Sequence, residues 1–161
     1  MIRQILLAAI TFGAVAALDS SEANANTLCI RPVEESADKV RFVQTHFMVA
    51  ALQCRYDSSS KLPELYNDFV RGHDIHLKNS EAPLRAFLKR QGEQTLDTYM
   101  VTIANKVSLQ STKLTEFCDR TEAAAELSNH ASSPEALLEL MPVRYQRPAA
   151  RCISEPVSLR Y

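Results

Sequence analysis

Four cysteines spread along the chain constrain its fold more than any other feature. They stand at positions 29, 54, 118 and 152, and no two of them form a C-x-x-C pair. This spacing disfavours a zinc or redox site. In an oxidising compartment, four such cysteines predict two disulfides, for which three pairings are possible. The chain is therefore expected to be a small domain stapled by two covalent links, and this expectation depends on export.

The first 25 residues have the layout of a secretory signal peptide. Arg3 precedes an apolar run from Ile5 to Leu18, and Ala23-Asn24-Ala25 places small residues before a cleavage site. The run has 14 residues, whereas a helix needs about 20 to cross a bilayer. We therefore predict that residues 1–25 are removed during export to the periplasm or extracellular space. The mature chain is expected to have no transmembrane anchor.

The mature chain, beginning at Asn26, is expected to be electrically neutral. Removal of Arg3, Asp19 and Glu22 from 18 basic and 19 acidic residues leaves 17 of each. A neutral chain has no field of one sign to attract nucleic acid or an anionic membrane, so neither is an expected partner. The chain has only three glycines, whereas sandwiches and barrels need many glycine-bearing turns. The composition favours helices.

Apolar residues recur at helical spacing and predict an all-α bundle of four or five helices. The expected helices are residues 33–55, 62–77, 80–91, 95–127 and 134–141. Ser80 and Thr95 are expected N-caps, Ser132 with Glu135 predicts a capped start for the last helix, and Gly92 is an expected helix end. Residues 26–141 are thus predicted to form one helical domain. The remainder, residues 142–161, is predicted to be an irregular tail with prolines and arginines, tied to the domain by Cys152.

The predicted helices distinguish the possible disulfide pairings. Cys54 and Cys118 lie on apolar stripes of long helices, while Cys29 and Cys152 lie in irregular segments. A continuous helix would separate Cys29 from Cys54 by roughly 30 Å, but a disulfide needs Cα atoms within about 7 Å. We favour Cys54–Cys118 with Cys29–Cys152. The pairing of Cys29–Cys118 with Cys54–Cys152 stays open because it depends on helix direction.

His73 and His76 are the best local candidates for metal chemistry. Residues three apart share a helix face, so both imidazoles could reach one ion, with a third ligand from Asp74, His46 or His130. However, His73 continues an apolar stripe and His76 lies near an expected helix end, where the helix dipole favours histidine. Packing and capping are therefore the favoured roles. No metal site and no cofactor are predicted.

Other patterns give little support to catalysis. There is no G-x-S-x-G elbow, and paired carboxylates such as Glu34-Glu35 are interpreted as solvated charges. The aromatic residues at helical spacing are interpreted as core rather than as a ligand pocket; they are Phe47, Phe69, Phe87, Tyr99 and Phe117. The tail arginines, Arg144, Arg147 and Arg151, are a weak signal for an acidic or phosphate-bearing partner.

The chain contains a set of short segments at residues 47–54, 66–70 and 103–105, followed by Phe117-Cys118. Together these segments resemble a group of small exported bacterial proteins of unassigned function. The resemblance covers about residues 40 to 118. It implies pairing of Cys54 with Cys118, and it implies no catalytic residue and no substrate.

These observations favour an exported, non-enzymatic binding or structural component over an enzyme. The expected partner is another protein of the envelope or extracellular space. A metal-binding protein or metal-dependent hydrolase that uses His73 and His76 is the alternative. A small-molecule carrier is a third class, which would show a large apolar cavity between helices.

Overall fold

The computed structural model describes residues 29–56, 59–92 and 95–152, and the predicted leader lies outside these ranges. The described residues form helices and no strand, which confirms the predicted all-α class. The elements are α2 (Pro32–Gln53), η1 (Cys54–Tyr56), α3 (Leu62–Gly72), α4 (Asp74–Arg90), α5 (Leu96–Ser111), α6 (Phe117–Glu126), η2 (Leu127–His130) and η3 (Pro134–Leu140), where η denotes a 3-10 helix. Within these ranges, no helix has both the length and the apolar character needed to cross a bilayer.

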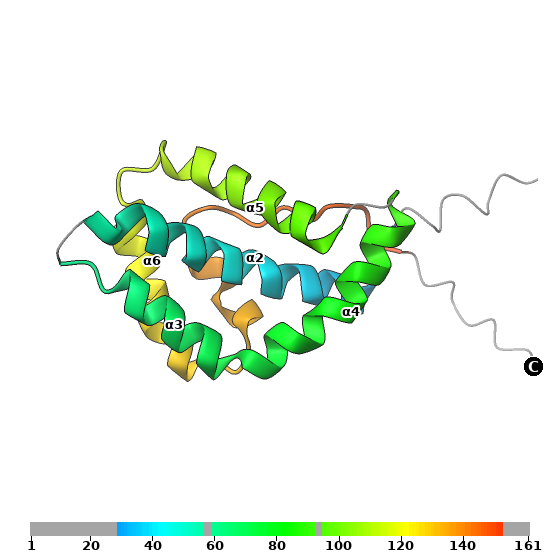
Figure 1. Ribbon diagram of the computed structural model, residues 1–161, viewed down its shortest axis with the longest axis horizontal. Helices are drawn as coiled ribbons and strands as arrows, with labels where there is room; N and C mark the ends of the chain where they lie inside the picture. Colours follow the sequence, from blue (N-terminus) through cyan, green and yellow to red (C-terminus); the bar gives the residue numbers. More distant parts are fainter. Residues whose placement is uncertain (1–28, 57–58, 93–94, 153–161) are drawn as a thin grey trace, which may run out of the picture.

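Helix α2 is the central element of the fold. It contacts α3, α4, α5, α6 and η3, and Figure 1 shows it running through the middle of the molecule. Consequently even polar residues of α2 are buried, among them Glu34, Glu35 and Asp38. Buried polar groups require partners. The side chains that supply them come from α4, α5 and the C-terminal segment, which we define as residues 141–152.

Two apolar clusters fill the spaces around α2. In the larger one, Phe47 of α2 meets Phe69 of α3 edge to face, with ring centroids 5.0 Å apart. The smaller one joins Ile30 to Leu84, Phe87 and Leu88 of α4. Full burial of one such side chain stabilises the fold by about 1.5–3 kcal/mol. These clusters hold α3 and α4 against opposite ends of α2.

Both favoured disulfides are present, and the alternative pairing is therefore wrong. Cys54–Cys118 links the end of α2 to α6, with Cα atoms 5.9 Å apart. Cys29–Cys152 links the two ends of the described chain, with Cα atoms 4.8 Å apart. Beside the second link, Ile30 N–H donates to Ala150 O at 2.8 Å and Cys152 N–H donates to Ile30 O at 3.0 Å. The start of α2 and the end of the C-terminal segment are thus fixed together.

The predicted boundary between the second and third helices is wrong. The helical conformation is interrupted at His73, whose φ of −111° departs from helical geometry. Helix α4 then continues without interruption through Ser80 and Pro83. Ser80 does not act as an N-cap, because its hydroxyl donates to Leu77 O at 2.6 Å and accepts from Arg41 Nε at 2.8 Å. The bond from Arg41 of α2 stabilises this serine inside a helix. The prediction that Gly92 follows the helix end is confirmed by its φ of +109°.

The long helix predicted for residues 95–127 is two helices. Thr95 caps α5 as predicted, accepting from Thr98 N–H at 3.1 Å. The helix ends at Ser111, where two hydroxyls bond back to the preceding turn: Ser111 to Ser108 O at 2.7 Å and Thr112 to Leu109 O at 2.9 Å. Such bonds compete with helix continuation. The chain then reverses, so α6 returns with Cys118 facing Cys54.

The end of the described chain has no α-helix. The short helix predicted after Ser132 is the 3-10 helix η3, and its N-cap is Ser133, whose side chain makes no capping bond. The described part of the tail is helix-free, as predicted. In Figure 1 the C-terminal segment, drawn in orange, runs along α2. Its Tyr145 packs edge to face against Phe42 of α2, with ring centroids 5.5 Å apart.

Candidate functional site

A buried carboxylate lies where α2, α5 and the C-terminal segment meet. Asp38 of α2 is only 1% exposed. Tyr99 Oη of α5 donates to its Oδ1 at 2.7 Å, and Tyr145 Oη of the C-terminal segment donates to its Oδ2 at 2.6 Å. Each oxygen of one carboxylate thus binds a phenol from a different element. This arrangement fixes the C-terminal segment against the helices.

The same burial governs the protonation of all three groups. Burial raises the pKa of Asp38, a shift that the two tyrosine hydrogen bonds oppose. Burial, with the adjacent Asp38 charge, also raises the pKa of Tyr99 and of Tyr145. Both phenols therefore keep their protons across the physiological range and act as hydrogen-bond donors. The cluster is a fixed set of dipoles around one carboxylate.

A cavity of about 200 Å³ opens above this cluster, and we call it the tyrosine pocket. The lining residues are Asp38 and Phe42 from α2, Tyr99, Thr102, Ile103 and Lys106 from α5, and Tyr145, Gln146, Arg147 and Pro148 from the C-terminal segment. Lys106 Nζ donates to Gln146 Oε1 at 2.7 Å and so connects two walls. The floor is polar, while Phe42, Ile103 and Pro148 make the walls largely apolar.

One exposed apolar side chain of α5 lies on the same side of the helix as this pocket. Leu109 is 65% exposed. At 3.6 residues per turn, it lies on the same side of α5 as Thr102, two turns farther along the helix. Leu109 therefore offers an apolar contact on α5 beyond a pocket with a polar floor.

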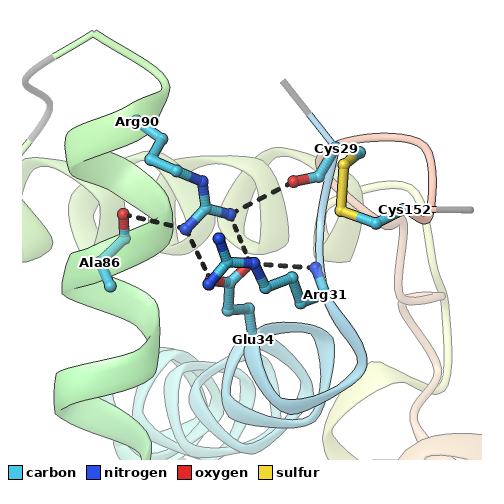
Figure 2. A network of polar contacts seen from close by, with 6 residues as sticks. All are labelled: Cys29, Arg31, Glu34, Ala86, Arg90 and Cys152. Carbon is cyan, nitrogen blue, oxygen red and sulfur yellow. Dashed lines mark hydrogen bonds and ion pairs between the residues drawn. A yellow bond between two sulfur atoms is a disulfide. The ribbon is translucent and has the colours of Figure 1, made fainter. Parts of the chain in front are cut away.

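Two buried glutamates at the start of α2 hold the chain ends together. Glu34 is paired in a bidentate manner with Arg90 of α4, with Nη1–Oε1 at 2.7 Å and Nη2–Oε2 at 2.6 Å. As Figure 2 shows, Arg90 also donates to Cys29 O, at 3.3 Å, beside the disulfide to Cys152. Although burial opposes the shift, the hydrogen bonds from Arg90 and Arg31 lower the pKa of Glu34.

Glu35 makes the matching contact to the C-terminal segment. Arg151 donates to it twice, from Nε at 2.5 Å and from Nη2 at 2.8 Å. The Arg151 hydrogen bond, opposed by burial and assisted by Lys39, lowers the pKa of Glu35 to about 2. The interpretation of Glu34-Glu35 as solvated charges is therefore wrong, because α4 and the C-terminal segment cover both side chains.

The structure places His73 and His76 next to each other without a metal-binding arrangement. Their ring centroids are 5.8 Å apart. His73 Nε2 is hydrogen-bonded to Ser128 O at 3.0 Å, and Asp74 forms an ion pair with Lys78 at 2.7 Å. His46 is buried elsewhere, against Phe117. Over the described ranges, no three His, Cys, Asp or Glu side chains are grouped as a metal ion requires.

His46 is a buried titratable group with a measurable consequence. It is fully buried, Val143 N–H donates to its Nε2 at 3.3 Å, and burial lowers its pKa to about 4. Because the unfolded chain has an ordinary histidine pKa of about 6.5, it binds this proton first on acidification. The contribution of neutral His46 to the free energy of unfolding is therefore fully present above pH 6.5. This contribution is lost as the pH falls toward 4.

We expect His46→Gln to flatten the pH dependence of stability. Between pH 7 and pH 5, neutral His46 accounts for a loss of about 2 kcal/mol in the free energy of unfolding. The variant is expected to be less stable than wild type at pH 7, but its free energy of unfolding should not show this decrease between pH 7 and pH 5. Urea unfolding of both proteins at pH 7, 6 and 5 measures the difference. Parallel curves for the two proteins would show that His46 is not the titrating group.

The pattern of aromatic residues identified only part of the site. Of the five aromatic residues considered, only Tyr99 lines the tyrosine pocket, while Phe47, Phe69, Phe87 and Phe117 are core residues as predicted. Asp38 and Tyr145 were missed, although one signal was available. Asp38 shares a helix face with the apolar Phe42, four residues later, and a carboxylate on an apolar helix face indicates a partnered site.

Comparison of the chain with models of protein families, with curated proteins and with solved structures finds no match. The tyrosine pocket is therefore interpreted from its own geometry.

Proposed function

We propose that this chain is an exported, disulfide-stabilised helical protein that acts as a non-enzymatic binding component of the cell envelope or extracellular space. Its binding site is the tyrosine pocket, which receives one side chain of a partner protein. The observation that carries the proposal is the Asp38 carboxylate, held by Tyr99 and Tyr145 at the floor of an open cavity.

The chemistry of the floor supports binding rather than proton transfer. A general base must lie within hydrogen-bond reach of the proton that it removes. Here Asp38 is buried beneath two phenols that donate to its oxygens and whose raised pKa values keep their protons in place. Each phenol oxygen retains lone pairs that can accept a hydrogen bond. The pocket thus suits a side chain with an apolar body and a donor at its tip.

The size of the pocket supports a protein partner. Sites for drug-sized ligands usually measure about 300–1,000 Å³, whereas the tyrosine pocket measures about 200 Å³. Such a volume accommodates one side chain, and the exposed Leu109 extends the contact along α5. Interfaces of this kind place an anchor side chain in a pocket within a wider surface. This supports a protein-binding role over that of a small-molecule carrier.

Export is supported by the covalent framework and by the leader pattern. Disulfides form and persist mainly in oxidising compartments, and all four cysteines of this chain are paired. The pattern of residues 1–25 agrees with removal of a signal peptide. The resemblance of residues 40 to 118 to small exported bacterial proteins is part of the same proposal.

We expect Thr102→Trp to abolish partner capture by the mature protein. Thr102 is exposed and lines the tyrosine pocket, and its hydroxyl donates to Thr98 O within α5 at 3.0 Å, so the substitution fills the pocket at little cost in stability. Wild-type and variant proteins are immobilised and incubated with the native envelope and secreted fractions. Partner recovery is then measured by quantitative mass spectrometry, and we expect a decrease of roughly tenfold or more for the variant.

Thr112→Trp is the matched control. Thr112 is also exposed and also bonds back within its own helix, but it lies outside the pocket. Because the natural chain has no tryptophan, fluorescence shows whether each new indole is enclosed or exposed to solvent. Equal recovery of the same partners by wild type and by Thr102→Trp, with the indole enclosed, would refute the tyrosine pocket as the binding site.

A further inference from the structure

A second cavity, which we call the cationic pocket, lies where α2, α6, η3 and the C-terminal segment meet. It has a volume of about 330 Å³. Three cations line it, each from a different element: Lys39 from α2, Arg120 from α6 and Arg144 from the C-terminal segment. Tyr145 lines both this cavity and the tyrosine pocket, but the two cavities share no other lining residue.

The two arginines of this pocket are available for a ligand. Arg120 and Arg144 are exposed, and neither guanidinium has an ion pair or side-chain hydrogen bond with another described residue. Arginine in such a position is suited to bidentate binding of an oxyanion. The fold thus brings together two unpaired guanidiniums from segments far apart in the sequence.

The positive charge of Lys39, which lines the same cavity, is only partly neutralised by its ion pair. Its partner Glu35 lies 3.4 Å away but also binds Arg151 and lies 3.8 Å from Arg147. One carboxylate is therefore shared among three cations. Within the lining of the pocket, Glu139 is the single acid, so three cations against one carboxylate leave two positive charges.

The other residues that line the cationic pocket indicate the chemical character of the organic part of the ligand. Leu138, Met141, Pro142 and Tyr145 provide an apolar and aromatic surface beside the cations. We propose that the cationic pocket binds a phosphate monoester, whose dianionic group is held by Lys39, Arg120 and Arg144 and whose organic part lies against these apolar side chains. This site is separate from the proposed function and does not depend on it.

Titration with phenyl phosphate tests the proposal directly. Isothermal titration calorimetry is performed at low ionic strength with the disulfide-bonded mature protein, and phenol serves as the uncharged analogue. We expect saturable binding of phenyl phosphate, weaker binding of inorganic phosphate and no binding of phenol. Arg120→Gln and Arg144→Gln are each expected to weaken phenyl phosphate binding by roughly tenfold, because each removes charge-assisted hydrogen bonds.

Two control variants separate this site from other effects. Arg85→Gln removes an exposed arginine of α4 outside the pocket, and Thr102→Trp fills only the tyrosine pocket; both are expected to bind phenyl phosphate as wild type does. Absence of phenyl phosphate binding by wild type, or equal affinity of Arg144→Gln and wild type, would overturn the proposal. If Thr102→Trp loses partner capture but keeps phosphate binding, the two sites are independent.

A second experiment shows whether the phosphate belongs to a free ester or to a lipid headgroup. Sedimentation with phosphatidylcholine vesicles, with and without phosphatidic acid, measures binding to a lipid phosphate. Binding of phenyl phosphate without vesicle binding assigns the site to a free ester. Vesicle binding that requires phosphatidic acid and Arg144 assigns it to a lipid headgroup.

Discussion

Paired replacement of Cys54 and Cys118 by alanine is expected to lower the free energy of unfolding by about 4 kcal/mol. The two residues are 64 positions apart, and opening a loop of this length restores that much chain entropy to the unfolded state. Since domains of this size are usually stable by about 5–15 kcal/mol, the variant is expected to be marginal at 37 °C. Urea unfolding followed by far-ultraviolet circular dichroism measures the loss.

The second disulfide provides the comparison for this result. Cys29 and Cys152 are 123 positions apart, so their paired replacement by alanine is expected to cost about 5 kcal/mol by the same relation. A loss below about 1 kcal/mol for both variants would contradict the conclusion that these links stabilise the fold by restricting the unfolded chain.

Replacement of Arg90 by methionine is expected to destabilise the protein by about 3–5 kcal/mol at pH 7. Glu34 is 2% exposed, and Arg90 holds both of its carboxylate oxygens. Removal of one partner leaves a buried charge without its counterion, and this is costlier than removal of both. The double variant Glu34→Gln/Arg90→Met is therefore expected to recover most of the loss, because glutamine keeps an acceptor for Arg31 N–H.

The pH dependence identifies the cause of this loss. In wild type the pKa of Glu34 is lowered, so the ion pair stabilises the fold above the unfolded pKa and is lost as the pH falls. Without Arg90 the pKa of Glu34 is expected to rise. At low pH Glu34 then binds a proton, and its buried negative charge is removed. The deficit of Arg90→Met relative to wild type should therefore be smaller at pH 4 than at pH 7, as measured by urea unfolding.

Arg85→Met is the matched control for this variant. Arg85 is on the same helix, but it is 56% exposed and lies 3.9 Å from the exposed Glu81. Exposed pairs contribute about 0–1 kcal/mol, so little change is expected. An equal loss of stability for Arg85→Met and Arg90→Met would show that replacing any arginine of α4 has this effect, and that the buried ion pair is not its cause.

The class of the fold was predictable because it depends on local patterns of apolar spacing. Thr95 and Gly92 likewise mark helix ends through their own backbone chemistry. The disulfide pairing was predictable only in part. The apolar stripes favoured Cys54–Cys118, but the arrangement of the helices was needed to exclude Cys29–Cys118 with Cys54–Cys152.

Features that depend on distant partners were not predictable in this way. The local pattern predicts an N-cap at Ser80 because it does not show the hydrogen bond that Ser80 accepts from Arg41, 39 positions earlier. The tyrosine pocket was missed for the same reason, since Asp38 and Tyr145 are 107 positions apart. The burial of Glu34 and Glu35 follows from coverage of α2 on several sides, which a single apolar stripe does not indicate.

Photo-crosslinking in the native cell tests the proposed binding role most directly. A photoreactive amino acid is placed at Thr102 in the tyrosine pocket and, in a separate strain, at the exposed Ala82 of α4. We expect irradiation to produce a discrete adduct with an envelope or secreted protein from position 102 and none from position 82. No adduct from position 102, or the same adducts from both positions, would contradict a binding site at the tyrosine pocket.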